Sequence, residues 1–260
     1  CLSLVPIFTK RERVDWMKHH DTQGGALLSR RQGLILLGAT GVGWMLGDRL
    51  TTNSSVASPP QALCVLRPEQ TEGPYFVDER LHRMDIRSDP TDGRVTPGTQ
   101  LALTFHISRI RGGECHPLPD AQVDVWHCDA MGVYSDVRDP GFSTVGRKFL
   151  RGYQMTDTQG TARFLTIYPG WYPIRTVHIH FKIRTAPLAE KRYEFTSQLY
   201  FPDELTDRVH TALPYASQGR RRVRNQQDFI FRDGGERLIC QPSPTTGGYT
   251  ATFPIGLELS

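Results

Sequence analysis

Short runs in which apolar and polar residues alternate recur from about residue 100 to the end of the chain, separated by Gly- and Asp-rich turn signals. Alternation with a period of two is typical of half-buried strands, whereas an amphipathic helix needs a period near 3.6. The 24 Gly and 18 Pro among 260 residues also favour strands and loops over helices. Strands are predicted over residues 100–110, 121–127, 162–167, 177–183, 194–201, 227–231 and 249–253, and a short helix over 203–212. We therefore expect an all-β fold, a β-sandwich of mostly antiparallel strands with long loops and few short helices.

Residues 168–181 concentrate side chains that can carry chemistry, because they include Tyr172, Arg175, His178 and His180. On a strand, residues two apart point to the same face, so both imidazoles would enter one space. Two neutral imidazoles on one face can hold a transition metal. A cupin-type site pairs such histidines with a Glu a few residues further on. Here the next Glu lies ten residues past His180, so that alternative fits poorly.

A second stretch, residues 121–135, adds a tyrosine to the histidine pair. It begins with the alternation of a strand, Gly132 breaks the strand, and Tyr134 follows in the turn. Together with Tyr172, the candidate donors become two phenols and two imidazoles. Phenolate is an anionic oxygen donor, and tyrosine is an iron ligand in haem proteins. Two phenolates and one hydroxide would balance the charge of Fe(III), whereas zinc sites favour Cys, His and carboxylate.

The order of these motifs carries a family resemblance. The motifs lie at residues 71–76, 123–135, 149–152, 168–180 and 198–201. In this order, and with these neighbours, the chain resembles the intradiol ring-cleaving dioxygenases, among them protocatechuate 3,4-dioxygenase and the catechol and hydroxyquinol 1,2-dioxygenases. The likeness covers roughly residues 64–231, and the ordered set is far more specific than any one motif.

The resemblance implies a non-haem Fe(III) centre and a set of residues around it. The implied metal ligands are Tyr134, Tyr172, His178 and His180, with Tyr172 and His180 as the axial pair. Tyr172 is also implied to leave the iron and take a proton from the substrate. Arg175 would sit beside the bound ring, where its charge favours developing negative charge. Gln198 would be a neighbouring polar group, and Tyr75 would line the pocket mouth in its own chain or a neighbour's, as in a possible homo-oligomer.

The activity that the resemblance implies is cleavage of a catecholic ring by O2 between its two hydroxylated carbons. Both oxygen atoms would enter a cis,cis-muconate-type product, which makes the protein an oxidoreductase. One alternative is a non-catalytic exported β-sandwich module that binds aromatics or carbohydrate. Another is a hydrolase or metal-transport domain that holds zinc or copper at the histidine pair, although two tyrosines would be unusual there.

The region before the motifs bears on the branch of the family. Catechol 1,2-dioxygenases carry a helical domain ahead of the catalytic part, and the polar, Pro-containing residues 51–94 do not resemble one. We therefore expect the protocatechuate-like, exported single-domain type. Whether the substrate needs a ring carboxylate stays open.

Several other histidines and cysteines have structural interpretations. His127 is expected in the core or just behind the site, and Trp126 is expected in the core. Four further histidines have no partner pattern in the sequence and are expected to be structural, namely His82, His106, His116 and His210. Outside the N-terminal segment the chain has four cysteines, Cys64, Cys115, Cys128 and Cys240, which allow three disulfide connectivities. Cys128 lies beside the proposed site and could instead stay a buried thiol.

The N-terminal segment has the pattern of an export signal. Arg30 and Arg31 precede an apolar run over residues 34–46, which at 13 residues is short for a membrane span. Paired arginines before such a run are typical of twin-arginine signals, and an uncleaved anchor is the alternative. We predict a leader over residues 1–50, with Met17 as the true start and residues 1–16 as an upstream artefact.

A linker rich in Ser, Pro and Thr is predicted over residues 51–63, and the catalytic domain over 64–260. Cleavage in the linker would release an exported protein, periplasmic or extracellular, without a stable membrane span. The leader and linker hold seven basic and four acidic residues, which leaves 24 basic and 23 acidic residues in the predicted domain. A domain so near neutrality gives no reason to expect a nucleic acid partner.

Overall fold

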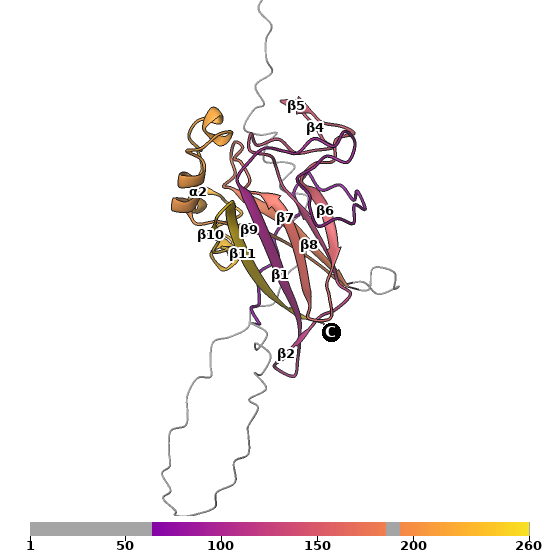
Figure 1. Cartoon of the computed structure of the whole chain (residues 1–260). Coiled ribbons are helices and arrows are strands. Elements are labelled where there is room, and N and C mark those ends of the chain that lie inside the picture. The colour runs from indigo at the N-terminus through magenta and orange to yellow at the C-terminus, as the bar shows by residue number, and fades with distance from the viewer. Residues whose placement is uncertain (1–63, 186–192, 260) are drawn as a thin grey trace, which may run out of the picture. The chain divides into compact units, whose positions relative to one another are not determined.

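The computed structural model describes residues 64–185 and 193–259 (Figure 1). The predicted leader over residues 1–50 and the linker over residues 51–63 lie outside this part, so those interpretations stay predictions. Among the described residues, no helix is long and apolar enough to cross a membrane.

Two packed sheets dominate the described domain (Figure 1). The first contains β10 (Ser243–Thr245), β11 (Gly248–Glu258), β1 (Gln100–Arg111), β2 (Glu114–Pro117) and β7 (Thr161–Ile167). Its central pair, β1 and β11, is parallel, and its other pairings are antiparallel. The second contains, in spatial order, β6 (Arg151–Met155), β3 (Gln122–Trp126), β8 (His178–Thr185) and β9 (Tyr193–Tyr200), all antiparallel. This arrangement confirms the predicted all-β sandwich.

Shorter elements lie in the loops between the strands. They are the hairpin of β4 (Arg138–Asp139) and β5 (Phe142–Ser143), the helix α2 (Asp203–Val209), and the 3-10 helices η1 (Tyr215–Gln218), η2 (Asn225–Gln227) and η3 (Gly235–Leu238). The predicted helix over residues 203–212 is therefore confirmed as α2, although it ends three residues earlier.

The apolar core lies between the two sheets. Phe105 of β1 packs against Phe181 of β8 and Phe253 of β11, with ring centroids 5.3 and 6.1 Å apart. Alternate residues of β3 and β8 point inward, and Val123, Val125, Ile179, Phe181 and Ile183 are all buried there. The alternation that predicted strands is thus the pattern that fills this core.

The opposite face of the second sheet is polar and nevertheless buried. Its buried polar or charged members are Asp124, Arg151, His178, His180, Lys182, Arg184 and Gln198. Register brings them together, since His180 pairs with Trp126 on one side and with Gln198 on the other. Burying polar groups is unfavourable unless they find partners, so a polar buried face marks the part of the fold that carries the site.

One predicted strand, over residues 227–231, is wrong. This part of the chain forms η2 and then turns. The Asp228 carboxylate accepts the backbone N–H groups of Ile230 at 2.8 Å and of Phe231 at 3.2 Å, which fixes a turn instead of a ladder. The apolar Ile230 and Phe231 imitate a strand in the sequence, but Phe231 reaches the core from a turn. The other six predicted strands are present with shifted ends, whereas β2, β6 and the short strands were not predicted.

The cysteines form one disulfide among the described residues. Cys64 is bonded to Cys115, with Cα atoms 5.8 Å apart, which ties the start of the domain to β2. Cys128 and Cys240 are free and buried. Cys128 therefore stays a thiol beside the site.

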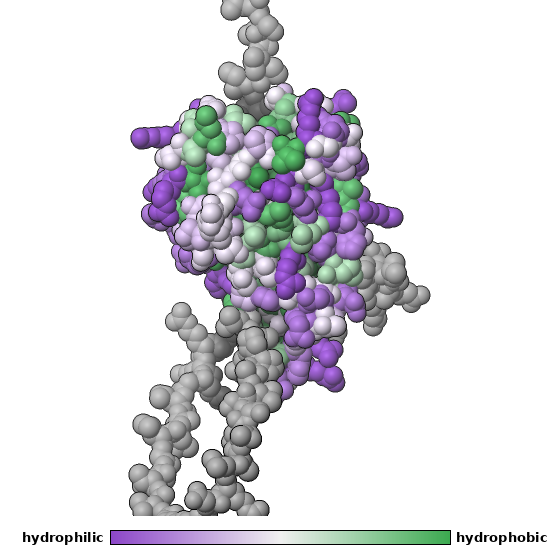
Figure 2. All heavy atoms as spheres, viewed as in Figure 1, coloured by the Kyte–Doolittle hydropathy of each residue, from purple (hydrophilic) through white to green (hydrophobic). Residues whose placement is uncertain are grey.

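The face shown in Figure 2 mixes hydrophilic and hydrophobic residues and presents no single continuous apolar area. The exposed large apolar side chains come from distant parts of the chain, for example Met84, Val145 and Leu213. An interface between copies of this chain therefore stays a prediction.

Candidate active site

His178 and His180 lie side by side because both project from the polar face of β8. Their ring centroids are 4.6 Å apart and their Nε2 atoms approach to 3.0 Å. The Nδ1 atom of His178 is 2.7 Å from the carbonyl oxygen of Thr176, which can only accept a hydrogen bond. His178 therefore carries its proton on Nδ1, and the lone pair of Nε2 points into the site.

Tyr172 reaches the same point from the loop that precedes β8. Its Oη lies 3.2 Å from Nε2 of His178. Gly170 makes this loop possible, because a Cβ there would come within 2.4 Å of the carbonyl oxygen of Ala130. The Gly170 N–H also donates to the carbonyl oxygen of Asp129 at 3.0 Å, which joins the two loops that carry the tyrosines.

Tyr134 enters from the loop that follows β3. Gly132 has φ of +79°, and a Cβ there would lie 2.3 Å from the carbonyl oxygen of Trp171, so glycine is required. The Tyr134 ring centroid lies 5.8 Å from that of Tyr172 and 6.3 Å from that of His180. The structure therefore brings together all four of the residues that the sequence nominated as metal ligands.

Neighbouring side chains hold these four residues in place. The Trp126 indole stacks on His180, with centroids 5.0 Å apart and planes at 8°. The Arg151 guanidinium donates to the carbonyl oxygen of Ser135 at 2.6 Å, next to Tyr134 in the chain. The Thr144 hydroxyl donates to the carbonyl oxygen of Tyr134 at 2.6 Å.

Burial keeps the four side chains neutral in the protein alone. Burial, and then the neighbouring Tyr172, raise the pKa of Tyr134 well above its ordinary value. Burial raises the pKa of Tyr172 to about 12, although the nearby charge of Arg175 acts in the opposite direction. Burial, followed by the charge of Arg175, lowers the pKa of both His178 and His180 well below the ordinary range. Imidazoles are therefore ready to ligate, and phenolates need a cation beside them.

The residues present fit a metal ion. The Tyr134 hydroxyl is fully buried and has no hydrogen-bond partner, although it lies among the other three donors. Two facing imidazole nitrogens cannot both point their lone pairs at each other without cost, whereas both can point at a cation. In the part of the chain described here, no cluster of three or more His, Cys, Asp or Glu could hold a metal. The candidate donors are two imidazoles and two phenols, a set that suits a highly charged ion.

Arg175 is buried and held by two partners. Its Nε donates to Asp228 at 2.8 Å and its Nη2 donates to Gln198 at 2.5 Å. Gln198 has two further partners, since its Oε1 also accepts from Tyr200 at 3.1 Å and its Nε2 donates to the carbonyl oxygen of Thr71 at 2.9 Å. Both nominated residues are therefore next to the site, joined in one network.

Tyr75 packs against the two tyrosines of the site, Tyr134 and Tyr172, within the same chain. Its ring stacks on Tyr134, with centroids 4.6 Å apart, and meets the Tyr172 ring edge-on at 6.3 Å. Its hydroxyl donates to the Asp139 carboxylate at 2.7 Å. A neighbouring chain is thus not needed to supply this residue.

Sequence reasoning missed Asp228 and undervalued Trp126. Asp228 is fully buried and accepts from both Arg175 and the backbone N–H of Thr176, at 2.8 and 2.7 Å. A buried arginine needs an acidic partner, but the sequence does not say which of the many Asp and Glu residues supplies it. Trp126 was expected in the core, and it is the direct register partner of His180, a pairing that only strand register reveals.

Two further histidines, His127 and His210, have contacts outside the donor set. His127 is fully buried, with Nε2 2.7 Å from the Thr166 hydroxyl and Nδ1 2.8 Å from the Cys128 carbonyl oxygen. His210 donates from Nε2 to the carbonyl oxygen of Pro169 at 3.0 Å and so supports the Tyr172 loop.

Comparisons with known proteins point to one family. A family model described as dioxygenase matches residues 71–229. The beta chain of protocatechuate 3,4-dioxygenase from Burkholderia cepacia is 32% identical over 159 residues, which are 56% of this chain and 66% of that relative. Hydroxyquinol 1,2-dioxygenase from Corynebacterium glutamicum is 29% identical over 133 residues, 44% of this chain and 40% of that relative. The chain thus spans less than two thirds of the length of either relative.

The fold agrees with a solved structure of an intradiol ring-cleavage dioxygenase from Tetranychus urticae. The two superpose with a TM-score of 0.63 and 29% identity, over 75% of this chain and 95% of that chain.

Proposed function

Since the chain belongs to the intradiol ring-cleavage dioxygenase family, we propose that it uses non-haem Fe(III) and O2 to cleave a catecholic ring between its two hydroxylated carbons. The product would be a cis,cis-muconate-type dicarboxylic acid. The observation that carries the proposal is the convergence of two buried imidazoles and two tyrosines, whose polar atoms find few partners in the protein itself.

The residues that would hold the iron are Tyr134, Tyr172, His178 and His180. When bound, Fe(III) supplies a Lewis acid that orients both catechol oxygens and activates the ring towards O2. Two phenolates and a hydroxide would offset its three positive charges, which avoids an uncompensated charge in this buried place.

Tyr172 is the residue best placed to handle a proton. A catechol must lose two phenolic protons to bind as a dianion, and a Tyr172 phenolate could accept one of them at Oη. The loop position supports this assignment, because Tyr172 is only half-buried whereas Tyr134 is fully buried. Tyr172 is therefore the donor that can move with the least loss of packing.

Arg175 would stabilise negative charge on the substrate. Asp228 and Gln198 fix its guanidinium, and its charge already acts on Tyr172. A charge held in place before the reaction needs no reorganisation when the substrate ionises. Gln198 accepts a hydrogen bond from Arg175 at Oε1, so we assign it to positioning Arg175, and we assign Tyr75 to the mouth of the site.

The test is aerobic turnover by the purified full chain with catechol, protocatechuate and hydroxyquinol, and product analysis by mass spectrometry. Intradiol cleavage adds both oxygen atoms and yields a dicarboxylic acid, whereas cleavage outside the hydroxyl pair yields an aldehyde. The iron-loaded protein should also show a tyrosinate-to-Fe(III) absorption band that shifts when catechol is added. Recovery of unchanged substrates by iron-loaded protein would refute the proposal and favour the non-catalytic binding module.

We also propose that the protein is exported. The support is the paired arginines before the apolar run over residues 34–46, together with the Cys64–Cys115 disulfide, since disulfides persist in oxidising compartments. Replacing Arg30 and Arg31 by Lys in the full chain should retain it in the cytoplasm of a bacterium with twin-arginine transport. Unchanged export of that variant would contradict a twin-arginine route.

A further inference from the structure

The face of β8 that carries His178 and His180 continues with two cations, Lys182 and Arg184. Residues two apart on a strand share a face, so all four side chains form one row. Both cations are nearly buried, with side chains 11% and 10% exposed. A buried cation needs partners, and each of these cations has one partner on a segment far away in sequence.

Residues 72–78, the crossing segment, run over this face and end at these cations. Near its start, Glu72 forms an ion pair with Lys182. At its end, Asp78 forms an ion pair with Arg184 at 3.0 Å. One cation therefore holds each end of the crossing segment against the strand that carries the histidines.

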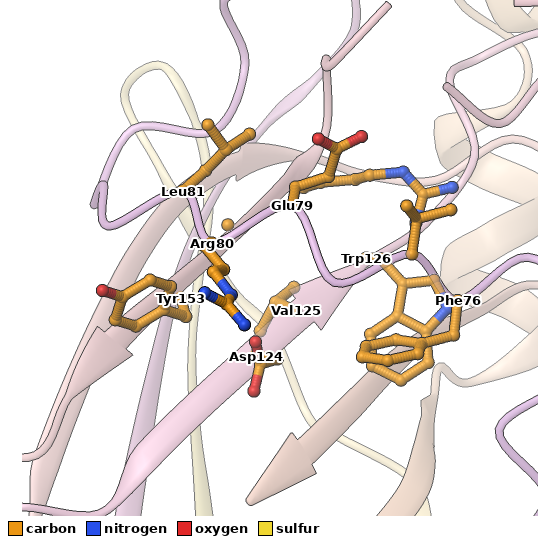
Figure 3. A pocket seen from close by; sticks show the side chains of 11 residues that line it. Phe76, Glu79, Arg80, Leu81, Asp124, Val125, Trp126 and Tyr153 are labelled. Carbon is orange, nitrogen blue, oxygen red and sulfur yellow. The ribbon is translucent and has the colours of Figure 1, made fainter. Parts of the chain in front are cut away.

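The residues between the two ion pairs touch the site. Gly73 lies so close to His180 that a Cβ would meet its Cε1 at 3.3 Å. Tyr75 stacks on Tyr134, as described above. Phe76 packs edge-on against Trp126 with centroids 4.8 Å apart, and Trp126 in turn stacks on His180 (Figure 3).

The same two cations also hold Phe76. The Lys182 Nζ lies 4.3 Å from the centroid of the Phe76 ring, and the Arg184 guanidinium carbon lies 5.6 Å from it. Cation–π contacts of this kind are attractive, and they strengthen when the cation is partly desolvated. A small pocket of about 10 Å³ lies beside this contact, and Phe76, Trp126 and Asp124 are among the residues that line it (Figure 3).

Side chains alone hold the crossing segment in place. Within the described ranges, no backbone hydrogen bond joins residues 72–78 to the sheet. The nearest such bonds flank it, from Gln70 to Thr196 and from Arg83 to Tyr153. The conformation of the segment therefore depends on its two ion pairs and on the contacts of Tyr75 and Phe76.

We propose that Lys182 and Arg184 are positioning residues of the reaction, which hold residues 72–78 so that Tyr75 and Phe76 complete the mouth and the back wall of the site. This inference rests on the proposed function, because it assigns the two cations to that same site. The proposal predicts that breaking the ion pair at either end of residues 72–78 weakens substrate binding more than it slows the chemical step, because no metal donor is changed.

The variants are chosen so that no buried charge is left without a partner, because Lys182 keeps Glu194 and Arg184 keeps Asp124. Lys182→Met leaves two partly exposed carboxylates, those of Glu72 and Glu194. Glu72→Gln breaks the same pair from the exposed side, and Lys182→Arg is the conservative replacement. Arg184 itself is left intact because it also forms an ion pair with the buried Asp124. The Asp78 end of the crossing segment is therefore tested by Asp78→Asn. The matched control is Arg87→Met, which breaks an ion pair with Asp85 that does not touch residues 72–78.

Chymotrypsin cleavage after Tyr75 or Phe76, identified by mass spectrometry, measures the release of the segment without any need for turnover. We expect Lys182→Met, Glu72→Gln and Asp78→Asn to speed this cleavage and to lower kcat/KM about tenfold, mainly through KM. The tyrosinate–iron band should remain, Lys182→Arg should restore both readouts, and the Lys182→Met/Glu72→Gln double variant should be no worse than either single one.

Two outcomes would overturn the inference. Unchanged chymotrypsin cleavage of all three variants would show that the ion pairs do not hold the segment. Faster chymotrypsin cleavage, with kcat/KM and KM for the catechol unchanged, would show that the segment does not position the site. Absence of turnover in the unaltered, iron-loaded protein would instead refute the proposed function, and the cleavage assay would still decide whether the cations hold the segment.

Discussion

Single residues in this protein derive their chemistry from burial. Tyr134 is a fully buried phenol without a hydrogen-bond partner, and His178 and His180 are buried imidazoles whose protonation is suppressed. In water each of these groups would be unremarkable in its protonation. Because these groups are packed together, a cation is their natural partner. Removing one atom from this donor set should therefore change metal binding and turnover strongly, whereas the same change outside the set should not.

The first prediction concerns the Tyr134 hydroxyl. Tyr134→Phe removes one atom that has no protein partner, so the stability should change little. Iron loading should fall, the tyrosinate absorption band should weaken, and turnover of catechol should drop by at least about 100-fold. Iron analysis, the visible spectrum and turnover measure these changes.

Tyr168→Phe is the matched control for Tyr134. It removes a buried hydroxyl that bonds with Thr206 at 2.7 Å, outside the donor set, so the absorption band should persist. An unaltered band in Tyr134→Phe would remove that residue from the ligand set.

A second prediction concerns pH and His127. Burial lowers the pKa of His127 to about 4, whereas the unfolded value is near 6.5. As the pH falls, the unfolded chain binds the proton first, so stability is full above about 6.5 and is lost as the pH falls towards 4. Between pH 7.5 and 5, this group should account for about 2 kcal/mol of the lost free energy of unfolding.

Chemical denaturation of wild type and His127→Gln at both pH values measures this contribution. The variant should be less stable at pH 7.5 but lose less on acidification. Titration of the other histidines affects both proteins alike and cancels in the comparison. Equal losses in the two proteins would contradict a neutral, buried His127.

At the scale of elements, two loops and one strand build the donor set. The loops after β3 and before β8 carry the tyrosines, and β8 carries the histidines. Gly132 and Gly170 let the loops pack backbone against backbone. The relative position of Tyr134 and Tyr172 therefore depends on two contacts that leave no space for a side chain.

Gly170→Ala tests this packing. Its Cβ would lie 2.4 Å from the carbonyl oxygen of Ala130, and backbone cannot yield as a side chain can. We expect the free energy of unfolding to fall by about 2 kcal/mol or more, together with loss of the tyrosinate–iron band. Gly247→Ala is the control, because nothing lies within 4 Å of the added methyl group, and its stability should be unchanged or slightly higher. A Gly170→Ala protein with normal stability and spectrum would disprove the dependence on this contact.

For the whole molecule, the Cys64–Cys115 bond joins the start of the described domain to β2, across 51 positions of sequence. Closing a loop of this length restricts the unfolded chain and should stabilise the fold by about 2–4 kcal/mol. Replacing both cysteines by Ala should lower the free energy of unfolding by that amount, as measured by chemical denaturation. The tyrosinate–iron band should persist because neither cysteine contacts the donor set.

Reductant provides the control for the disulfide. It should destabilise the unaltered protein and leave the double variant unchanged. Equal stability of the two proteins under oxidising conditions would show that the bond contributes nothing.

Local patterns in the sequence determined much of this protein. Period-two alternation predicted six strands, and the spacing of His178 and His180 predicted one shared face, because both depend only on neighbouring residues in the chain. The ordered motifs around Tyr134 and Tyr172 predicted the family and its donor set. The strand over residues 227–231 failed because Asp228 fixes a turn there, which alternation does not encode.

Only the tertiary structure decided which distant residues meet. Asp228 and Arg175, Trp126 and His180, and Glu72 and Lys182 are each separated by more than 50 positions in the sequence. Their contacts follow from strand register and from the paths of loops, which depend on the packing of the whole domain and not on any local period. The sequence thus determined which groups could do the chemistry, and the fold decided which partners hold those groups in place.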